Sequence, residues 1–203
     1  MSDTIKIEDK TLFFSGDVSL VDDRDRIVAV VGARSASSWG LKAAARIGER
    51  LAQAGFIVCN GLAAGIDTAA VEGALSSDGR VIAVLPGSLD NVYPKANAGL
   101  AARIIEGGGL LISEHDSGHQ LDKTDFISRD DVQAMLSSRC VVVECSENGG
   151  TMHTVRFCLK RNVPIGAVTR ETETCAGCRM IVDSDWGAEI GNGDDLDRFV
   201  SGS

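Results

Sequence analysis

The sequence is poor in aromatic residues and has no long apolar run. Phe, Trp and Tyr together make up 4% of its 203 residues, and Tyr occurs once. No apolar stretch reaches the ~20 residues that a membrane-spanning helix needs, and the charged N-terminal segment lacks the apolar core of a signal peptide. These absences predict a cytoplasmic globular chain without a membrane partner, with a core of Val, Ile, Leu and Ala.

Basic residues are also in deficit. Lys and Arg number 20 against 29 Asp and Glu, which gives a formal net charge of −9. Proteins that bind polyanions without selectivity gain affinity when Lys and Arg release phosphate counterions, so the composition argues against such binding. One basic cluster, Arg34, Lys42, Arg46 and Arg50, follows the first predicted strand, and a solvated helix face explains it more simply than a binding patch.

Signatures of metals and cofactors are scarce. Cys175-Ala-Gly-Cys178 is the only C-x-x-C, whereas a structural zinc site usually needs a second pair or added histidines. Its late place in the chain, away from the first helix, also disfavours a redox dithiol. His115, His119 and Asp116 share a polar segment that a surface loop explains. No G-x-G-x-x-G, G-x-S-x-G or H-E-x-x-H motif is present, so we expect neither a metal nor a cofactor.

Short apolar runs alternate with amphipathic stretches along the chain. This alternation predicts an α/β, Rossmann-like, doubly wound and mostly parallel sheet with helices on both faces. We expect the main domain over residues 27–170, an N-terminal extension with a short strand over 1–26, and a tail over 171–203 packed on the same domain. Predicted strands cover 12–17, 28–31, 56–59, 80–85, 110–113, 140–144, 163–168 and 180–183. Predicted helices cover 40–54, 66–79, 96–106, 128–138, 151–161 and 194–200, and a long polar loop covers 114–125.

Most of the predicted strands run into turns rich in glycine and polar residues. In a parallel sheet these turns share the edge outside the carboxyl ends of the strands, where ligands bind. Glycine lets the backbone approach an anion closely, and the guanidinium of Arg34 can hold two phosphate oxygens at once. Tyr93 and Asn97 could contact a base or merely anchor their loop. The expected ligand-binding residues are Gly32, Arg34, Ser35, Gly61, Gly65, Asp67, Gly87, Ser88, Tyr93, Asn97, Gly149 and Gly150.

Several polar residues at this edge have competing explanations. Arg34 needs a partner, which could be the carboxylate of Asp67 or Glu114 instead of a phosphate. Asp67 also fits the first turn of a helix, where the helix dipole stabilises a carboxylate. Glu114 and Glu144 are the only catalytic candidates, because paired carboxylates could polarise a water for N-glycoside cleavage. Capping of turns explains these two glutamates more simply.

Five blocks of residues carry family information. They are Phe14-Ser-Gly-Asp17, Val28-Ala-Val-Val-Gly-Ala-Arg34 with Trp39-Gly40, Asn60-Gly-Leu-Ala-Ala-Gly-Ile-Asp67, Pro86-Gly-Ser-Leu-Asp-Asn-Val-Tyr-Pro94 with Asn97, and Leu111-Ile-Ser-Glu114. In order and spacing, over roughly residues 12–168, they resemble the DNA-processing protein A (Smf) family. The resemblance implies a Rossmann-like fold that binds single-stranded DNA, forms a homodimer and loads a recombinase during uptake of transforming DNA. The wider superfamily includes cytokinin-activating phosphoribohydrolases.

The chain also departs from the family pattern. In the block from Phe126 to Ser137 the family's first arginine is kept as Arg129, and the resemblance assigns it to the ligand. Asp130 and Asp131 replace an asparagine and an arginine, which places negative charge where the DNA backbone would run. Gly149-Gly150-Thr151 stands where the family has S-G-[ST], and this adds Thr151 to the expected phosphate site.

Two functions are therefore open from the sequence. The first is a single-stranded DNA-binding protein without enzymatic activity, acting in DNA processing and recombination as a homodimer with a recombinase as a partner. The second is a protein that binds a nucleotide or nucleotide-derived small molecule in the same pocket, as a sensor or as a phosphoribohydrolase-like enzyme. The second needs fewer basic residues, which suits the acidic composition. A dimer with a vestigial pocket is a third alternative.

Overall fold

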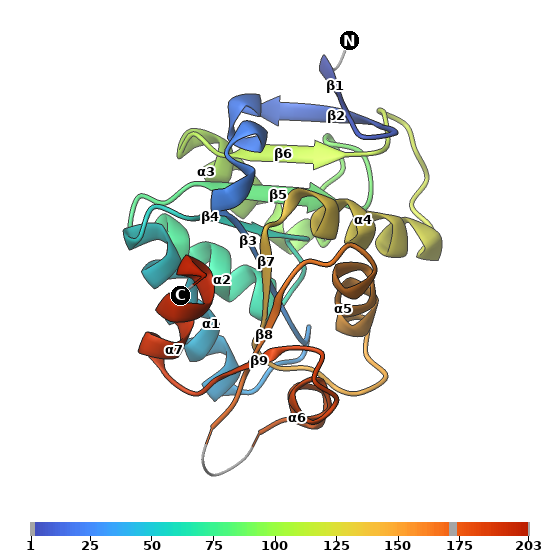
Figure 1. Cartoon of the computed structure of the whole chain (residues 1–203). Coiled ribbons are helices and arrows are strands. Elements are labelled where there is room, and N and C mark those ends of the chain that lie inside the picture. Colours follow the sequence, from blue (N-terminus) through green and yellow to red (C-terminus); the bar gives the residue numbers. More distant parts are fainter. Residues whose placement is uncertain (1–2, 171–173, 203) are drawn as a thin grey trace.

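A nine-stranded sheet runs through the part of the chain that the structure, a computed structural model, describes, residues 3–170 and 174–202. Residues 1–2 of the expected extension, and 171–173 and 203 of the expected tail, lie outside it. The strands are β1 (Asp3–Ile7), β2 (Lys10–Gly16), β3 (Ile27–Val31), β4 (Ile57–Asn60), β5 (Val81–Leu85), β6 (Leu110–Ser113), β7 (Arg139–Val142), β8 (Ile165–Val168) and β9 (Ala188–Ile190). Their spatial order is β1-β2-β6-β5-β4-β3-β7-β8-β9 (Figure 1).

Strand β3 lies in the interior of the sheet between two parallel neighbours. Val28 lies opposite Val58 of β4, and Ala29 lies opposite Cys140 of β7. From β3 the chain winds through β4 and β5 to β6 on one side, then returns to β7 and winds outward on the other. β1 and β2 form an antiparallel hairpin beyond β6. The carboxyl ends of β3 and β7 therefore form the topological switch point of the sheet.

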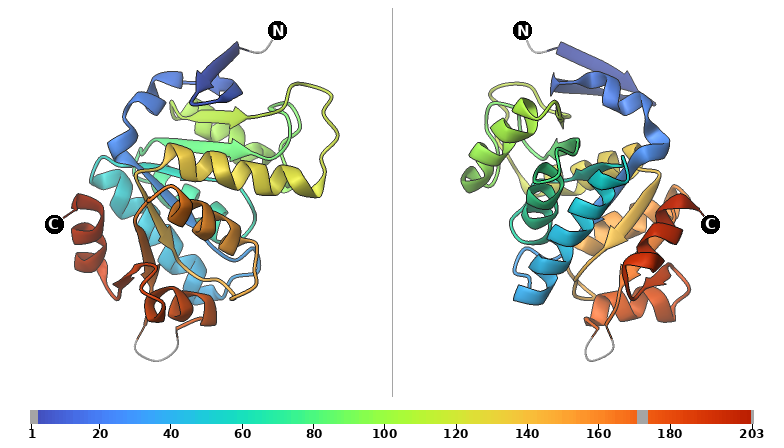
Figure 2. Two further views of the ribbon diagram at one scale, coloured as in Figure 1. Left: turned by 45° about the vertical axis from the view of Figure 1, so that its right-hand side comes forward. Right: turned by 90° about the vertical axis from the view of Figure 1, so that its left-hand side faces the viewer.

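Helices cover both faces of the sheet (Figure 2). They are α1 (Ser38–Gln53), α2 (Ile66–Leu75), α3 (Ala98–Glu106), α4 (Lys123–Leu136), α5 (Thr151–Lys160), α6 (Ala176–Asp183) and α7 (Gly193–Ser201). On one face Ile47 of α1 and Leu196 of α7 share a buried cluster with α2 and α3. On the other face Met135 of α4 and Val155 of α5 belong to two further clusters. The structure confirms the expected doubly wound, mostly parallel α/β sheet.

Two glycines bring α1 and α2 into close contact. A Cβ at Gly48 would overlap the carbonyl oxygen of Ala70, and a Cβ at Gly73 would overlap the carbonyl oxygen of Ala45. Glycine at both positions lets one backbone lie directly on the other. This contact fixes α2, and with it the loop between β4 and α2, against the switch point.

The strand predicted over residues 180–183 is wrong. These residues belong to α6, where Gly177, Cys178 and Ile181 are buried at helical spacing. A short apolar run does not separate a buried helix from a strand by periodicity alone. The last strand, β9, pairs in parallel with β8 instead.

The structure also moves the start of one helix and adds one strand to the prediction. α4 begins at Lys123 instead of residue 128, because Asp122 and Asp125 form a capping box that starts the helix earlier. Strand β1 was not predicted, because its charged edge carries little of the apolar pattern that indicates a strand. Within the described ranges, every helix is too short or too polar to cross a bilayer.

Candidate functional site

A pocket of about 570 Å³ opens at the switch point of the sheet, and we call it the switch-point pocket. The loops after β3 and β7 form one side, and α4 and the start of α5 form the other. It is lined by Val31, Gly32, Ala33, Arg34, Ala63, Asp67, Tyr93, Lys123, Phe126, Ile127, Arg129, Asp130, Gln133, Cys145, Ser146, Gly149, Gly150, Thr151, His153 and Thr154.

The structure brings many of the expected ligand-binding residues together in this pocket. Gly61 lines a small hollow beside it, and Ser35 and Gly65 line another on the far side of the β3 loop. Gly87, Ser88 and Asn97 do not line it. The expected residues that do line it are Gly32, Arg34, Asp67, Tyr93, Arg129, Gly149, Gly150 and Thr151.

Arg129 is the buried cation of the pocket. Its side chain is 7% exposed, with Nη1 3.9 Å from Asp67 Oδ2 and Nε 3.2 Å from Asp130 Oδ1. A Cβ at Gly61 would overlap the guanidinium, so glycine at this position makes room for it. Because a buried charge is costly without a partner, the two carboxylates explain how Arg129 is held inside the protein.

Asp67 holds the loop after β4 while it faces Arg129. Its Oδ2 accepts hydrogen bonds from the backbone N–H groups of Gly61 at 3.1 Å and Ala63 at 3.3 Å. Burial raises the pKa of Asp67 from 3.8 to about 6, and Arg129 opposes the rise. Burial also raises the pKa of Asp130, again opposed by Arg129. Both carboxylates are thus less acidic than surface groups.

Two buried nitrogen atoms on α4 have no hydrogen-bond partner among the described residues. They are Nε of Arg129 and Nε2 of Gln133, and Gln133 is 1% exposed. Residues four apart share one helix face, so the spacing from Arg129 is the signal that could have added Gln133 to the prediction. An unsatisfied buried donor costs about 1–3 kcal/mol. A ligand that supplies acceptors here would recover part of that free energy.

Aromatic side chains stand at the mouth of the pocket. The Tyr93 ring meets the Phe126 ring edge-on, with centroids 5.4 Å apart and planes at 76°. The guanidinium carbon of Arg34 lies 5.0 Å from the Phe126 ring centre. Tyr93 is 44% exposed, so its ring is accessible to a ligand. Phe126 was not predicted as a site residue.

The expected carboxylate partners of Arg34 are occupied by other cations. Asp67 faces Arg129 at 3.9 Å, and Glu114 accepts a hydrogen bond from Lys10 Nζ at 2.6 Å. The exposed Arg34 side chain instead reaches across the mouth of the pocket to Phe126.

The N-terminus of α5 opens into the pocket. Gly150 is its N-cap and provides no side-chain cap, and a Cβ built on Gly150 meets no atom within 4 Å. Free N–H groups at a helix start bind anions, aided by the helix dipole. His153 and Lys123 line the same pocket and add positive or ionisable groups near this turn.

Two expected ligand contacts are loop anchors in the structure. The buried Nδ2 of Asn97 donates to the Leu62 carbonyl oxygen at 2.8 Å and to Thr68 Oγ1 at 2.9 Å. The buried Ser88 hydroxyl donates to Asp90 Oδ1 at 2.6 Å. These bonds hold the loops after β4 and β5, and use the polar atoms that the sequence analysis offered to a ligand.

Glu114 and Glu144 both carry structural hydrogen bonds. Glu144 accepts from the Ser37 backbone N–H at 2.9 Å and from the Ser37 hydroxyl at 2.7 Å, at the start of α1. Glu114 binds Lys10 and accepts from the Ser128 hydroxyl. Neither glutamate lines the switch-point pocket.

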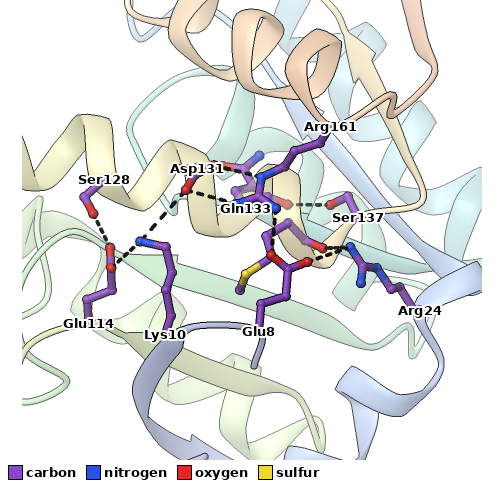
Figure 3. Close-up of polar contacts among 10 residues, drawn as sticks. Glu8, Lys10, Arg24, Glu114, Ser128, Asp131, Gln133, Ser137 and Arg161 are labelled. Atoms are coloured by element: carbon purple, nitrogen blue, oxygen red, sulfur yellow. Dashed lines mark hydrogen bonds and ion pairs between the residues drawn. The ribbon is translucent and has the colours of Figure 1, made fainter. Parts of the chain in front are cut away.

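Asp131 is turned away from the pocket, unlike its neighbour Asp130. Figure 3 shows its carboxylate bound to Arg161. The Nε–Oδ1 and Nη2–Oδ2 distances of this pair are 2.8 and 3.1 Å. Arg161 Nη1 also binds Glu8 at 2.9 Å, and Lys10 Nζ lies 3.9 Å from Asp131. The expectation that both aspartates oppose the ligand is therefore corrected, since only Asp130 lines the pocket.

Two groups of side chains among the described residues could hold a metal ion. His115 and His119 stack with ring centres 3.7 Å apart, and their Nε2 atoms lie 3.2 and 2.7 Å from the oxygens of Asp125. Asp125, and not the neighbouring Asp116, completes this group. The second group is a cluster of three cysteines outside the family blocks.

Comparison with known proteins links the chain to one family. The family model described as DNA recombination-mediator protein A matches residues 2–199. The putative DNA processing protein DprA of Mycobacterium tuberculosis is 32% identical over 192 residues, covering 93% of this chain and 49% of the relative. The DNA processing protein DprA of Bacillus subtilis is 28% identical over 157 residues, covering 77% and 52%. The chain thus spans about half the length of these curated relatives.

Solved structures share the fold. DNA processing protein A of Streptococcus pneumoniae superposes with a TM-score of 0.82 at 30% identity, over 92% of this chain and 65% of that one. The Helicobacter pylori protein, described by its single-stranded DNA binding mode, gives a TM-score of 0.86 at 24% identity, over 100% and 95%. A molybdenum cofactor binding protein from Rippkaea orientalis gives 0.62 at 16%, over 87% and 95%. The last two likenesses show the fold alone.

Proposed function

The chain belongs to the DNA recombination-mediator protein A family, and from this membership we infer that it binds single-stranded DNA and acts in DNA processing and recombination. The observation that carries the proposal is the switch-point pocket, which combines an open helix N-terminus with accessible aromatic rings. Proteins that bind single strands combine a cationic groove that follows the nucleic-acid backbone with aromatic rings on which bases stack.

The phosphate contacts are assigned to the two loops of the switch point. No side chain caps the start of α5, and a Cβ at Gly150 would meet no atom within 4 Å, so the backbone N–H groups at Gly150 and Thr151 are assigned to a phosphate. Arg34 and Lys123 supply the cations, because both are exposed and line the pocket. An arginine here can hold two oxygens of one phosphate, which a lysine cannot do.

The base contacts are assigned to two parts of the switch-point pocket, the aromatic rings at its mouth and the buried polar side chains of α4 inside it. The exposed Tyr93 ring offers a face for stacking, and Phe126 supports it edge-on. Gln133 Nε2, which has no hydrogen-bond partner among the described residues, is a donor that an acceptor on a base edge would satisfy. Arg129 Nε is ion-paired with Asp130 without hydrogen-bond geometry, so it is a second donor available to the base. This combination favours single-stranded nucleic acid over a duplex, in which the bases are already stacked.

The acidic composition does not oppose the proposal. Asp131 is paired with Arg161 away from the pocket, and Asp130 and Asp67 share the charge of Arg129. Because Glu114 and Glu144 are both engaged outside the pocket, the site suits binding more than N-glycoside cleavage. A homodimer, a recombinase partner and a cytoplasmic location belong to the same proposal.

Fluorescence anisotropy with a labelled single-stranded oligonucleotide tests the proposal at low salt. We expect binding by the full chain, and Arg34→Ala should weaken it by about 1.5–3 kcal/mol, the contribution of a charge-assisted hydrogen bond, or roughly 10- to 150-fold in Kd. Arg103→Ala is the matched control, because Arg103 pairs with Glu72 on α2 and does not line the pocket.

The same titration separates the proposal from its alternative. Binding of nucleoside monophosphates with no binding of the oligonucleotide would favour a small-molecule site instead. Equal losses in Arg34→Ala and Arg103→Ala would place the contact outside the pocket and contradict the assignment of Arg34.

A further inference from the structure

Three cysteines from two distant segments meet beside the carboxyl end of β7. Cys145 follows β7, and Cys175 and Cys178 lie at the start of α6. Their three Sγ atoms lie within 4.8 Å of one another. With Zn–S bonds of about 2.3 Å, tetrahedral geometry places thiolate sulfurs about 3.8 Å apart, so a small adjustment would suffice. We propose that Cys145, Cys175 and Cys178 form a zinc site.

The backbone around the cluster is arranged to hold the sulfur atoms together. The Cys145 N–H donates to Cys175 Sγ at 3.2 Å, and the Gly177 N–H donates to the Cys145 carbonyl oxygen at 3.1 Å. A Cβ at Gly177 would overlap Cys145 Sγ. Glycine inside Cys175-Ala-Gly-Cys178 therefore allows the turn to close on Cys145, and an N–H···S bond stabilises the thiolate that a metal needs.

The start of α6 favours negative sulfur atoms. Cys175 is the N-cap residue of α6, and Cys178 lies in the first turn. The positive end of the helix dipole lowers the cost of a thiolate at this position. The sequence analysis expected no metal because it found only one C-x-x-C pair; proximity in the fold adds Cys145 as a third donor.

The cluster has access to solvent. A cavity of about 170 Å³ reaches Cys175 between Ser37, Glu144 and Thr174. Among the described residues, the three cysteines supply three ligands and no fourth ligating side chain joins them. On binding, each thiol passes its proton to the buffer and the ion stays Zn²⁺, without any oxidant or reductant.

Titration of the reduced full chain with Zn²⁺ and then Co²⁺, without oxygen, tests the proposal. We expect one ion per chain, proton release on binding, and thiolate-to-cobalt charge-transfer absorption with the d–d bands of tetrahedral coordination. Cys175→Ala should lower the affinity by at least about 100-fold, more than loss of an outer-shell partner costs. Cys175 is only partly buried, at the edge of a core cluster, so this variant should fold.

Two control variants keep the assignment specific. Cys59→Ala removes a buried cysteine outside the cluster, and His119→Ala removes a ligand of the other candidate group. Both should retain the cobalt spectrum. A spectrum without charge-transfer bands, or uptake that survives Cys175→Ala but fails in His119→Ala, would overturn the proposal. The oligonucleotide test is read separately, because its variants Arg34→Ala and Arg103→Ala leave all three cysteines in place.

Discussion

Asp67 shows how burial and hydrogen bonding compete within one carboxylate. Two backbone N–H groups and Arg129 favour its charged form, yet burial outweighs them and raises its pKa from 3.8 to about 6. The folded protein therefore keeps the Asp67 proton to a higher pH than the unfolded chain does. The stability that this proton contributes is present below about pH 4 and is lost as the pH rises to about 6.

Asp67→Asn should remove this pH dependence. Asparagine keeps an oxygen for the N–H groups of Gly61 and Ala63 but does not titrate. At 1.36 kcal/mol for each pKa unit, the difference in unfolding free energy between pH 4 and pH 7 should change by about 2 kcal/mol, because part of the shift lies below pH 4. Urea denaturation of both proteins at the two pH values measures it. Asp25→Asn, at an exposed position, is the control; equal pH profiles for the wild type and Asp67→Asn would contradict the prediction.

Single residues also show how far the sequence could define the site. Arg34, Arg129 and the glycines of the turns after β3 and β7 line the pocket, as strand ends and family blocks predicted, whereas Gly87 does not. Gln133 and Phe126 were missed, because which helix face meets the pocket depends on how α4 packs. Asn97 was proposed for a ligand, but its amide binds Leu62 and Thr68, a contact across 35 residues that no local pattern predicts.

At the contact between α1 and α2, a Gly→Ala substitution has two opposing effects on stability, a gain in helix propensity and a loss from overpacking. Gly→Ala in a helix interior ordinarily stabilises by about 1 kcal/mol. At Gly48 the new Cβ would overlap the Ala70 carbonyl oxygen, and overpacking costs about 1–3 kcal/mol. We expect Gly48→Ala to lower the free energy of unfolding in chemical denaturation, because backbone atoms cannot turn aside as a side chain can.

Gly99→Ala is the matched control. Gly99 lies in α3 and a Cβ there meets nothing within 4 Å, so helix propensity acts alone and should stabilise by up to about 1 kcal/mol. Destabilisation of the same size at both sites would argue against the close contact as the cause.

The bidentate ion pair between Arg161 and Asp131 joins the end of α5 to α4. Arg161 is only 21% exposed, so its charge-assisted bonds are stronger than those of a surface pair. Arg161→Ala should destabilise by about 1.5–3 kcal/mol, and a double-mutant cycle with Asp131→Ala should show coupling by thermal and chemical denaturation. The Arg50–Asp197 pair has similar geometry but is exposed, and should couple less; equal coupling would contradict the role of burial.

At the level of elements, the sequence predicted most of the fold, because buried parallel strands are apolar throughout and helices have a clear period. It failed at α6, where Met180 to Val182 suits either structure, and at the start of α4. The capping box of Asp122 and Asp125 lies within the polar segment that was predicted to be a loop, so the helix start was not recognised there. β1 was missed because an edge strand needs no apolar face.

The whole molecule carries a net charge of −9, so DNA binding must depend on few phosphate contacts. Two cations, Arg34 and Lys123, line the pocket mouth, and each contact contributes about −0.7 to the slope of log K against log salt for single strands. We expect a slope near −1.4, or about a sevenfold loss of affinity between 50 and 200 mM salt. Anisotropy across this range measures it, and Arg34→Ala should halve the slope. A slope of zero, or one several times steeper, would contradict this contact count.

The hairpin of β1 and β2 limits how far the chain can be truncated from its N-terminus without disturbing the pocket. Glu8 and Lys10 reach Arg161, Asp131 and Glu114 across the outer side of α4 (Figure 3), and α4 carries Arg129 and Gln133 on its inner side. A fragment that starts at Ile27 would therefore leave Glu114 without its cation and Arg161 without one of its two carboxylate partners, beside the helix that frames the pocket. The smallest unit that preserves the ligand site includes the first strands of the chain, although none of their residues touches that site.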